Sequence, residues 1–131
     1  MGSEMCIRDS VEAERMLTSK VWTKEELMER GESFYATNCS ACHQANGKGI
    51  PPVFQALEGS QIALNDSARH IEILMEGVQG SAMAAFGNMY SEVDIASVIT
   101  YTRQAWSNGE NGDGVIVTPK DIVDYKNKID L

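Results

Sequence analysis

The sequence predicts an all-α domain. Apolar residues recur at helical spacing in three segments, at about 23–43, 67–77 and 91–106. The first and third segments each open with a capping pattern, a hydroxyl residue followed three positions later by an acidic one. No segment shows the alternation of apolar and polar residues that predicts a strand, and no internal repeat is evident. The 131 residues suffice for one domain with its own core.

The first helix is expected to begin at Thr23, because Thr23 and Glu26 have the spacing of a capping box. This helix should continue directly into residues 39–43 and orient their side chains. The residues expected on its buried face are Leu27, Gly31, Phe34 and Tyr35.

The middle of the chain is expected to contain a loop and a second helix. Residues 44–62 include several glycines and the pair Pro51-Pro52, which favour a loop. The second helix should span about 67–77 and end at Gly77 and Gly80. Its apolar positions are Ile71, Leu74, Met75 and Val78.

The third helix should follow a cap formed by Ser91 and Asp94. Residues 107–114 are rich in Gly and Asn and are expected to form a flexible turn. Thr118-Pro119-Lys120-Asp121 then predicts the start of a short terminal helix that ends near Lys128. The apolar stripe of the third helix consists of Ile95, Val98, Ile99, Thr102 and Trp106.

The chain is expected to divide into a tail or linker at 1–22 and a domain at 23–131. Residues 1–10 show no defensible periodicity and are interpreted as an artefact or a remnant of cloning, so Cys6 receives no role. No run of 18 apolar residues predicts a membrane span, and no signal peptide is visible.

Composition excludes some functions. The net charge of −8, from 19 acidic and 11 basic residues, argues against nucleic-acid binding. It is compatible with a basic protein partner, although acidity also serves solubility. Three cysteines do not make a disulfide framework.

The chemical motif is Cys39-Ser40-Ala41-Cys42-His43. Two cysteines separated by two residues and followed at once by histidine are typical of covalent c-type haem attachment. On a helix, Cys39, Cys42 and His43 would project from one face, so two thiols could bond the haem edge while the imidazole binds iron. A thioredoxin-like redox pair or half a zinc site is the alternative, but a second cysteine pair and a βαβ pattern are both absent from the sequence. A structural domain without haem is a further alternative.

The second iron ligand is expected to be Met83. A methionine thioether suits haem iron and raises its reduction potential. Met83 lies in a loop of small residues, whereas Met75 fits the apolar stripe of the second helix. Met89, just before a helix cap, is a weaker candidate that could simply make a local packing contact. His70 could also bind the iron, although a solvent-facing position or one beside the haem propionates is its more ordinary interpretation.

Several phrases together resemble the class I monohaem cytochromes c: Gly31-x-x-x-Tyr35-x-x-x-Cys39-x-x-Cys42-His43, Gly47-x-Gly49, Met83-x-x-Phe86-Gly87 and Val98-x-x-Tyr101. More narrowly, residues 18–128 resemble the C-terminal cytochrome c domain of subunit II in bacterial caa-type haem–copper cytochrome c oxidases. The resemblance implies three core helices around a covalent haem c plus a short C-terminal helix. It also implies that the helices cross near Gly31, Tyr35, Val98 and Tyr101.

The resemblance further implies an electron carrier on the periplasmic face of the bacterial inner membrane. Its partners would be an electron donor (a cytochrome c or a bc-type complex), a binuclear copper domain and the other subunits of the terminal oxidase. The domain would carry electrons, while oxidase activity would belong to the parent complex. Contact with the membrane would require upstream segments. Because haem attachment takes place in the periplasm, the natural chain is expected to be longer and to carry an export device.

The sequence departs from this family in two respects. The copper ligands of the preceding domain are absent from the chain. The family usually has a proline where Gln55 stands, and the carbonyl at that position orients the axial histidine. We therefore expect Gln55 O to accept a hydrogen bond from His43 Nδ1. Two other functions stay open, a free-standing periplasmic shuttle cytochrome and a haem-based sensor or enzyme with a displaceable sixth ligand.

Overall fold

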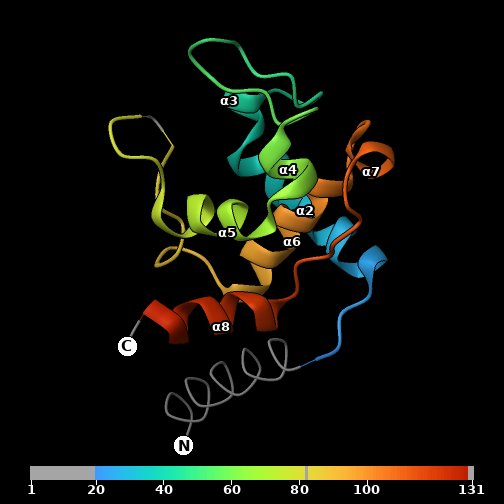
Figure 1. Cartoon of the computed structure of the whole chain (residues 1–131), viewed down its shortest axis with the longest axis vertical. Coiled ribbons are helices and arrows are strands. Elements are labelled where there is room, and N and C mark those ends of the chain that lie inside the picture. The colour runs from blue at the N-terminus through green and yellow to red at the C-terminus, as the bar shows by residue number, and fades with distance from the viewer. Residues whose placement is uncertain (1–19, 82, 130–131) are drawn as a thin grey trace, which may run out of the picture.

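A computed structural model describes residues 20–81 and 83–129, and every described element is helical (Figure 1). Two residues, Ile50 and Phe54, form an isolated β-bridge, and no strand occurs in these ranges. The all-α class is therefore confirmed. Cys6 and most of the expected tail at 1–22 lie outside the described residues, so the division of the chain stays a prediction. The helices are α2 (Lys24–Asn38), α3 (Ser40–His43), α4 (Gln61–Asn65), α5 (Ser67–Glu76), α6 (Glu92–Gln104), α7 (Asn108–Asn111) and α8 (Pro119–Ile129).

The helix starts follow the predicted caps. Thr23 Oγ1 accepts from Glu26 N at 3.2 Å, and Glu26 Oε1 accepts from Thr23 N at 3.0 Å, which completes the capping box of α2. Ser91 caps α6 by accepting from Asp94 N at 3.2 Å. Reciprocal bonds of the same kind join Thr118 and Asp121 at the start of α8.

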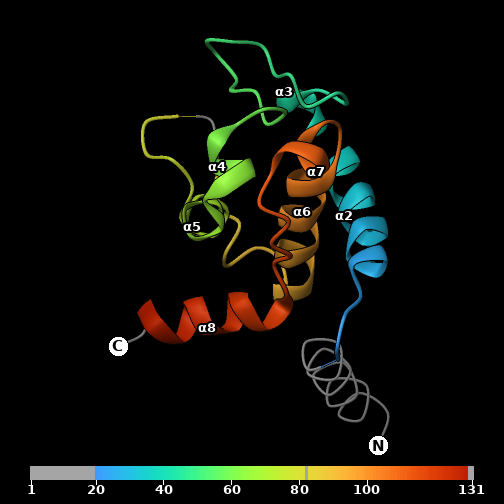
Figure 2. The same ribbon diagram turned by 45° about the vertical axis from the view of Figure 1, so that its right-hand side comes forward.

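The core forms where α2 and α6 cross. Gly31 of α2 lies directly against the backbone of Ser97, and a Cβ at Gly31 would lie 2.6 Å from the Cβ of Tyr101. Figures 1 and 2 show α2 and α6 side by side, with α4 and α5 on the other side of α6 and α8 across one end. The buried apolar residues include Leu27, Phe34, Tyr35, Ile71, Leu74, Met75, Ile95, Val98 and Ile99.

Outside the cysteine motif and its cavity, four details of the predicted elements are wrong. The expected loop at 44–62 contains the start of α4, and the expected turn at 107–114 contains α7. Each is a single turn, too short to show a periodic pattern. Trp106 lies beyond the end of α6, with φ +56°, so it does not continue the stripe of that helix. Val78 follows the cap of α5 and is 38% exposed.

Candidate haem site

The cysteine motif lies at a break between two helices. α2 ends at Asn38, and Cys39 has φ −122° and ψ −32°, so the first helix does not run unbroken through the motif as predicted. The single turn of α3 nevertheless preserves the helical spacing. Cys39 O accepts from Cys42 N at 3.2 Å and from His43 N at 3.0 Å. These bonds fix the spacing of the three side chains locally.

The two motif cysteines do not form a disulfide with each other, and both are half-buried. Burial, with a smaller contribution from the charge of Cys42, raises the pKa of the Cys39 thiol to about 11. A thioredoxin-like cysteine requires the opposite shift, because its thiolate is the nucleophile. The environment of Cys39 therefore disfavours the redox-pair alternative.

His43 has a fixed orientation. Its Nδ1 lies 2.8 Å from the backbone carbonyl oxygen of Gln55. A carbonyl oxygen can only accept, so Nδ1 carries the proton and donates it. This tautomer leaves a lone pair on Nε2, the arrangement that a metal-binding histidine requires.

One cavity joins the candidate residues. It has a volume of about 620 Å³, within the range of small-molecule and cofactor pockets. Cys39, Cys42, His43 and Met83 all line it, together with the exposed residue Gln55. The remaining wall is mainly apolar and includes Pro52, Val53, Phe54, Leu57, Ile62, Ala63, Ile73, Leu74, Val78, Phe86 and Val98.

Met83 reaches this cavity from a segment that is fastened to α5. Val78 N donates to Met83 O at 3.2 Å, and Phe86 N donates to Leu74 O at 2.8 Å. Gly77, with φ +71°, permits the close approach, because a Cβ there would lie 2.7 Å from Met83 O. The segment therefore presents Met83 to a cavity that His43 also lines.

The other methionine candidates differ from Met83. Met75 is 7% exposed and belongs to the core, as its place in the apolar stripe predicted. Met89 is 62% exposed and does not line the cavity.

His70 lies in an environment that the sequence did not predict. It is 5% exposed and lines the same cavity, so a solvent-facing position is wrong. Its Nε2 lies 3.2 Å from Thr102 Oγ1, and its Nδ1 has no partner. Burial, and then the charge of Arg103, lowers the pKa of His70 to about 3. His70 is therefore neutral at physiological pH.

Two further residues near the site gave no signal in the sequence. Asn108 is fully buried, although it lies in a stretch whose composition predicts an exposed turn. Arg103 is 2% exposed, with Nε donating to Val115 O at 3.0 Å and the guanidinium paired with Asp113. Asn108 bonds to residues about 50 positions upstream, and Arg103 bonds to residues that the chain brings back beside α6 after a turn. The local composition does not reveal either kind of partner.

Comparison with known proteins identifies the family. Residues 26–101 match the family described as "Cytochrome C oxidase, cbb3-type, subunit III". Cytochrome c-552 of Thermus thermophilus is 32% identical over 64% of this chain and 73% of its own length. Cytochrome c6 of Gracilaria tenuistipitata var. liui is 32% identical over 63% of this chain and 76% of its own length. The family match at 26–101 spans the cysteine motif, α2 from Glu26 onward and most of α6.

A longer relative is also similar. The gluconate 2-dehydrogenase cytochrome c subunit of Pantoea cypripedii is 27% identical over 82% of this chain, which spans 26% of that subunit. No helix among the described residues is long and apolar enough to cross a membrane. The chain belongs to the class I c-type cytochromes, as a monohaem domain of the family to which residues 26–101 match.

Proposed function

We propose that the chain carries single electrons through one covalent haem c. Cys39 and Cys42 would form the two thioethers, and His43 and Met83 would bind the iron. The observation that carries this proposal is the lining of one cavity by all four residues. A haem held there supplies a one-electron Fe(III)/Fe(II) couple.

The surrounding residues fit that cofactor. The hydrogen bond to Gln55 O holds a proton on His43 Nδ1 and makes Nε2 a better donor to the metal. The mainly apolar wall excludes water and lowers the local dielectric constant, and both effects influence the reduction potential of a bound haem. Val53 and Val78, both exposed, line the cavity as well and provide an apolar edge against which a redox partner can dock.

Two biological settings are compatible with such an electron carrier, a free-standing cytochrome and a domain of an oxidase. Relatives described as cytochrome c-552 and cytochrome c6 favour a free-standing periplasmic shuttle over an oxidase domain. The oxidase subunit II assignment, with a copper domain as acceptor, rests on the resemblance of the phrases around Cys42, Met83 and Tyr101. A cytochrome c or a bc-type complex would be the donor in that setting. The reading frame upstream of Val11 distinguishes the two, since a copper domain with membrane spans supports the oxidase and a lone signal peptide supports the shuttle.

The experiment is expression of the chain with the c-type haem maturation machinery, followed by a pyridine haemochrome spectrum and a potentiometric titration. We expect one haem per chain, retained after denaturation, and a reversible one-electron wave. The variants Cys39→Ser and Cys42→Ser should each lose one thioether and shift the haemochrome band. A chain that folds without haem would overturn the proposal. Ready binding of carbon monoxide by the ferrous protein would instead favour a sensor or enzyme with an open sixth site.

A further inference from the structure

The segment that orients His43 is held mainly by hydrogen bonds among its own residues and by contacts at its two ends. We call residues 44–59 the histidine loop, since its Gln55 carbonyl accepts from His43. Within the loop, Leu57 N donates to Gly47 O at 2.7 Å. The tip has little contact with the core, because Ile50 is 50% exposed and Val53 is 73% exposed. Ile50 and Phe54 also exchange two backbone bonds of 2.9 Å. These bonds shape the loop, and its placement relative to His43 depends in addition on what holds its two ends.

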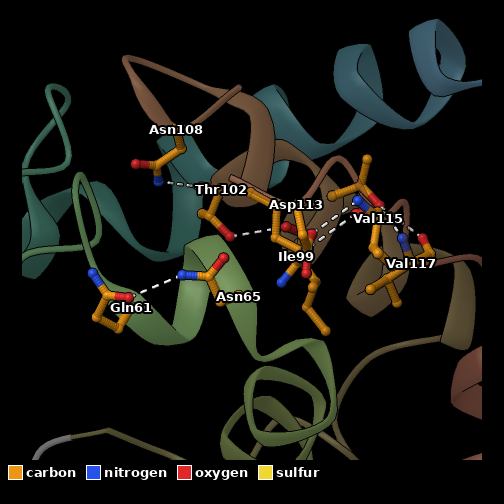
Figure 3. Close-up of polar contacts among 10 residues, drawn as sticks. Gln61, Asn65, Ile99, Thr102, Asn108, Asp113, Val115 and Val117 are labelled. Atoms are coloured by element: carbon orange, nitrogen blue, oxygen red, sulfur yellow. Dashed lines mark hydrogen bonds and ion pairs between the residues drawn. The ribbon is translucent and has the colours of Figure 1, made fainter. Parts of the chain in front are cut away.

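Asn108 holds the second end. Its Oδ1 accepts from Gly59 N at 2.8 Å, and its Nδ2 donates to Leu57 O at 3.0 Å. The other Nδ2 hydrogen goes to Thr102 O at 2.8 Å, as Figure 3 shows. The side chain is fully buried and uses both donors and an acceptor, so it ties the loop to the C-terminal end of α6.

Trp106 holds the first end. Its indole Nε1 donates to Ala45 O at 2.9 Å. Its ring covers Gly47, where a Cβ would lie 2.6 Å from the ring. The ring also packs edge-on against Tyr35 at a centroid separation of 5.4 Å, and Tyr35 itself donates from its hydroxyl to Gln44 O at 2.5 Å. Trp106 has φ +56°, an uncommon conformation for a bulky residue that the surrounding contacts must maintain.

Trp106 lies in the turn after α6 and Asn108 begins α7, so both residues fall outside the family match at 26–101. We infer that Trp106 and Asn108 are positioning residues for the iron ligand His43. They hold both ends of the histidine loop and so keep Gln55 O on His43 Nδ1. This inference rests on the proposed function, since it requires His43 to bind iron.

The consequence is measurable at the iron. When either attachment is lost, the Gln55 carbonyl moves more freely and its bond to His43 weakens. A weaker bond makes the imidazole a poorer donor, which disfavours ferric iron and raises the reduction potential. Exchange of the Nδ1 proton with water should also become faster, by up to about tenfold, which would correspond to complete loss of the bond to Gln55 O.

The test uses the haem-loaded full chain and three variants. Asn108→Ala removes the attachment at Gly59, and Trp106→Phe keeps a ring over Gly47 but removes the bond to Ala45. Asn111→Ala is the matched control, because Asn111 is an exposed asparagine of the same helix whose side chain bonds only to Ser107 O. For each variant the reduction potential, the exchange rate of the His43 Nδ1 proton by NMR and the free energy of unfolding are measured.

We expect Asn108→Ala to raise the potential and the exchange rate, Trp106→Phe to do so to a smaller degree, and Asn111→Ala to match the parent protein. Should Asn108→Ala fail to fold, Trp106→Phe carries the test alone. Loss of stability in both variants with an unchanged potential and exchange rate would overturn the inference and leave a purely structural role. A parent protein whose NMR spectrum shows no iron-bound His43 would instead refute the proposed function.

Discussion

Gly31 of α2 lies against the carbonyl group of Ser97 in α6 so closely that any Cβ at position 31 would collide with it. Gly31→Ala should therefore force the two helices apart and destabilise the protein by roughly 3 kcal/mol, the upper end of the usual cost of overpacking. Guanidinium chloride unfolding of the haem-loaded protein measures the change. Ser33→Ala, on the exposed face of the same helix, is the control and should stay within about 0.5 kcal/mol of the parent. Equal stability of all three proteins would show that the helices do not cross at Gly31.

Met83→Ala should remove the sixth iron ligand. Because a thioether raises the potential of haem iron, we expect the potential to fall and the near-infrared methionine–iron band of the ferric protein to disappear completely. Ferrous protein should then bind carbon monoxide. Met89→Ala is the control, since Met89 is exposed and does not line the cavity, and it should leave the band in place. A band that survives in Met83→Ala would assign the ligand elsewhere, with His70 as the next candidate on the cavity wall.

A substitution at Gly49 would disturb the hydrogen bond between His43 and Gln55 directly. A Cβ at Gly49 would lie 2.6 Å from Gln55 O, the atom that accepts from His43. Gly49→Ala should displace this oxygen and raise the reduction potential. Because Gly49 has φ +63°, the variant also introduces backbone strain. Gly114→Ala controls for that strain, since Gly114 has φ +76° with nothing within 4 Å of its Cβ position. Potentials that shift equally in both variants would contradict the expected role of Gln55 O.

His70 should make stability depend on pH. Its pKa is about 3 in the folded protein and 6.5 in its ordinary state. As pH falls below 6.5, the imidazole is protonated in the unfolded chain but stays neutral in the folded protein. The contribution of His70 to the free energy of unfolding is therefore complete above pH 6.5 and is lost toward pH 3. Between these limits the free energy of unfolding should fall by about 1.4 kcal/mol per pH unit more in the parent than in His70→Gln. Parallel curves for the two proteins between pH 6.5 and 4 would mean that His70 is not buried as a neutral base.

The sequence predicted the features that depend on neighbouring residues. The caps at Thr23, Ser91 and Thr118 are formed by residues three positions apart, so a short pattern contains all of their chemistry. The cysteine motif is likewise local. The burial of Leu27 and Ile99 also follows from helical spacing alone.

The environment of His70 could not be predicted in the same way. A histidine near a helix start is ordinarily exposed, and its burial here results from packing of α5 against Thr102, 32 residues away. Asn108 is similar, since its partners Leu57 and Gly59 lie about 50 positions upstream. The polar, glycine-rich composition around Asn108 predicts a solvated turn. Composition contains no information about which distant backbone groups need a hydrogen-bond partner, so the burial of the side chain could not be predicted.

The histidine loop has a consequence for the order of folding. The turn that holds Cys39, Cys42 and His43 depends on bonds between residues three and four positions apart, which form quickly in a nascent chain. The bond from Trp106 to Ala45 closes 61 residues, and that from Gly59 to Asn108 closes 49, so both wait for α6 to fold. Under the proposed function, the cysteines can therefore be presented for covalent haem attachment while the Gln55 carbonyl that accepts from His43 is still out of place. Haem attachment at the cysteines would then precede formation of the hydrogen bond between His43 and Gln55. The reduction potential would reach its final value only when the residues after α6 have folded.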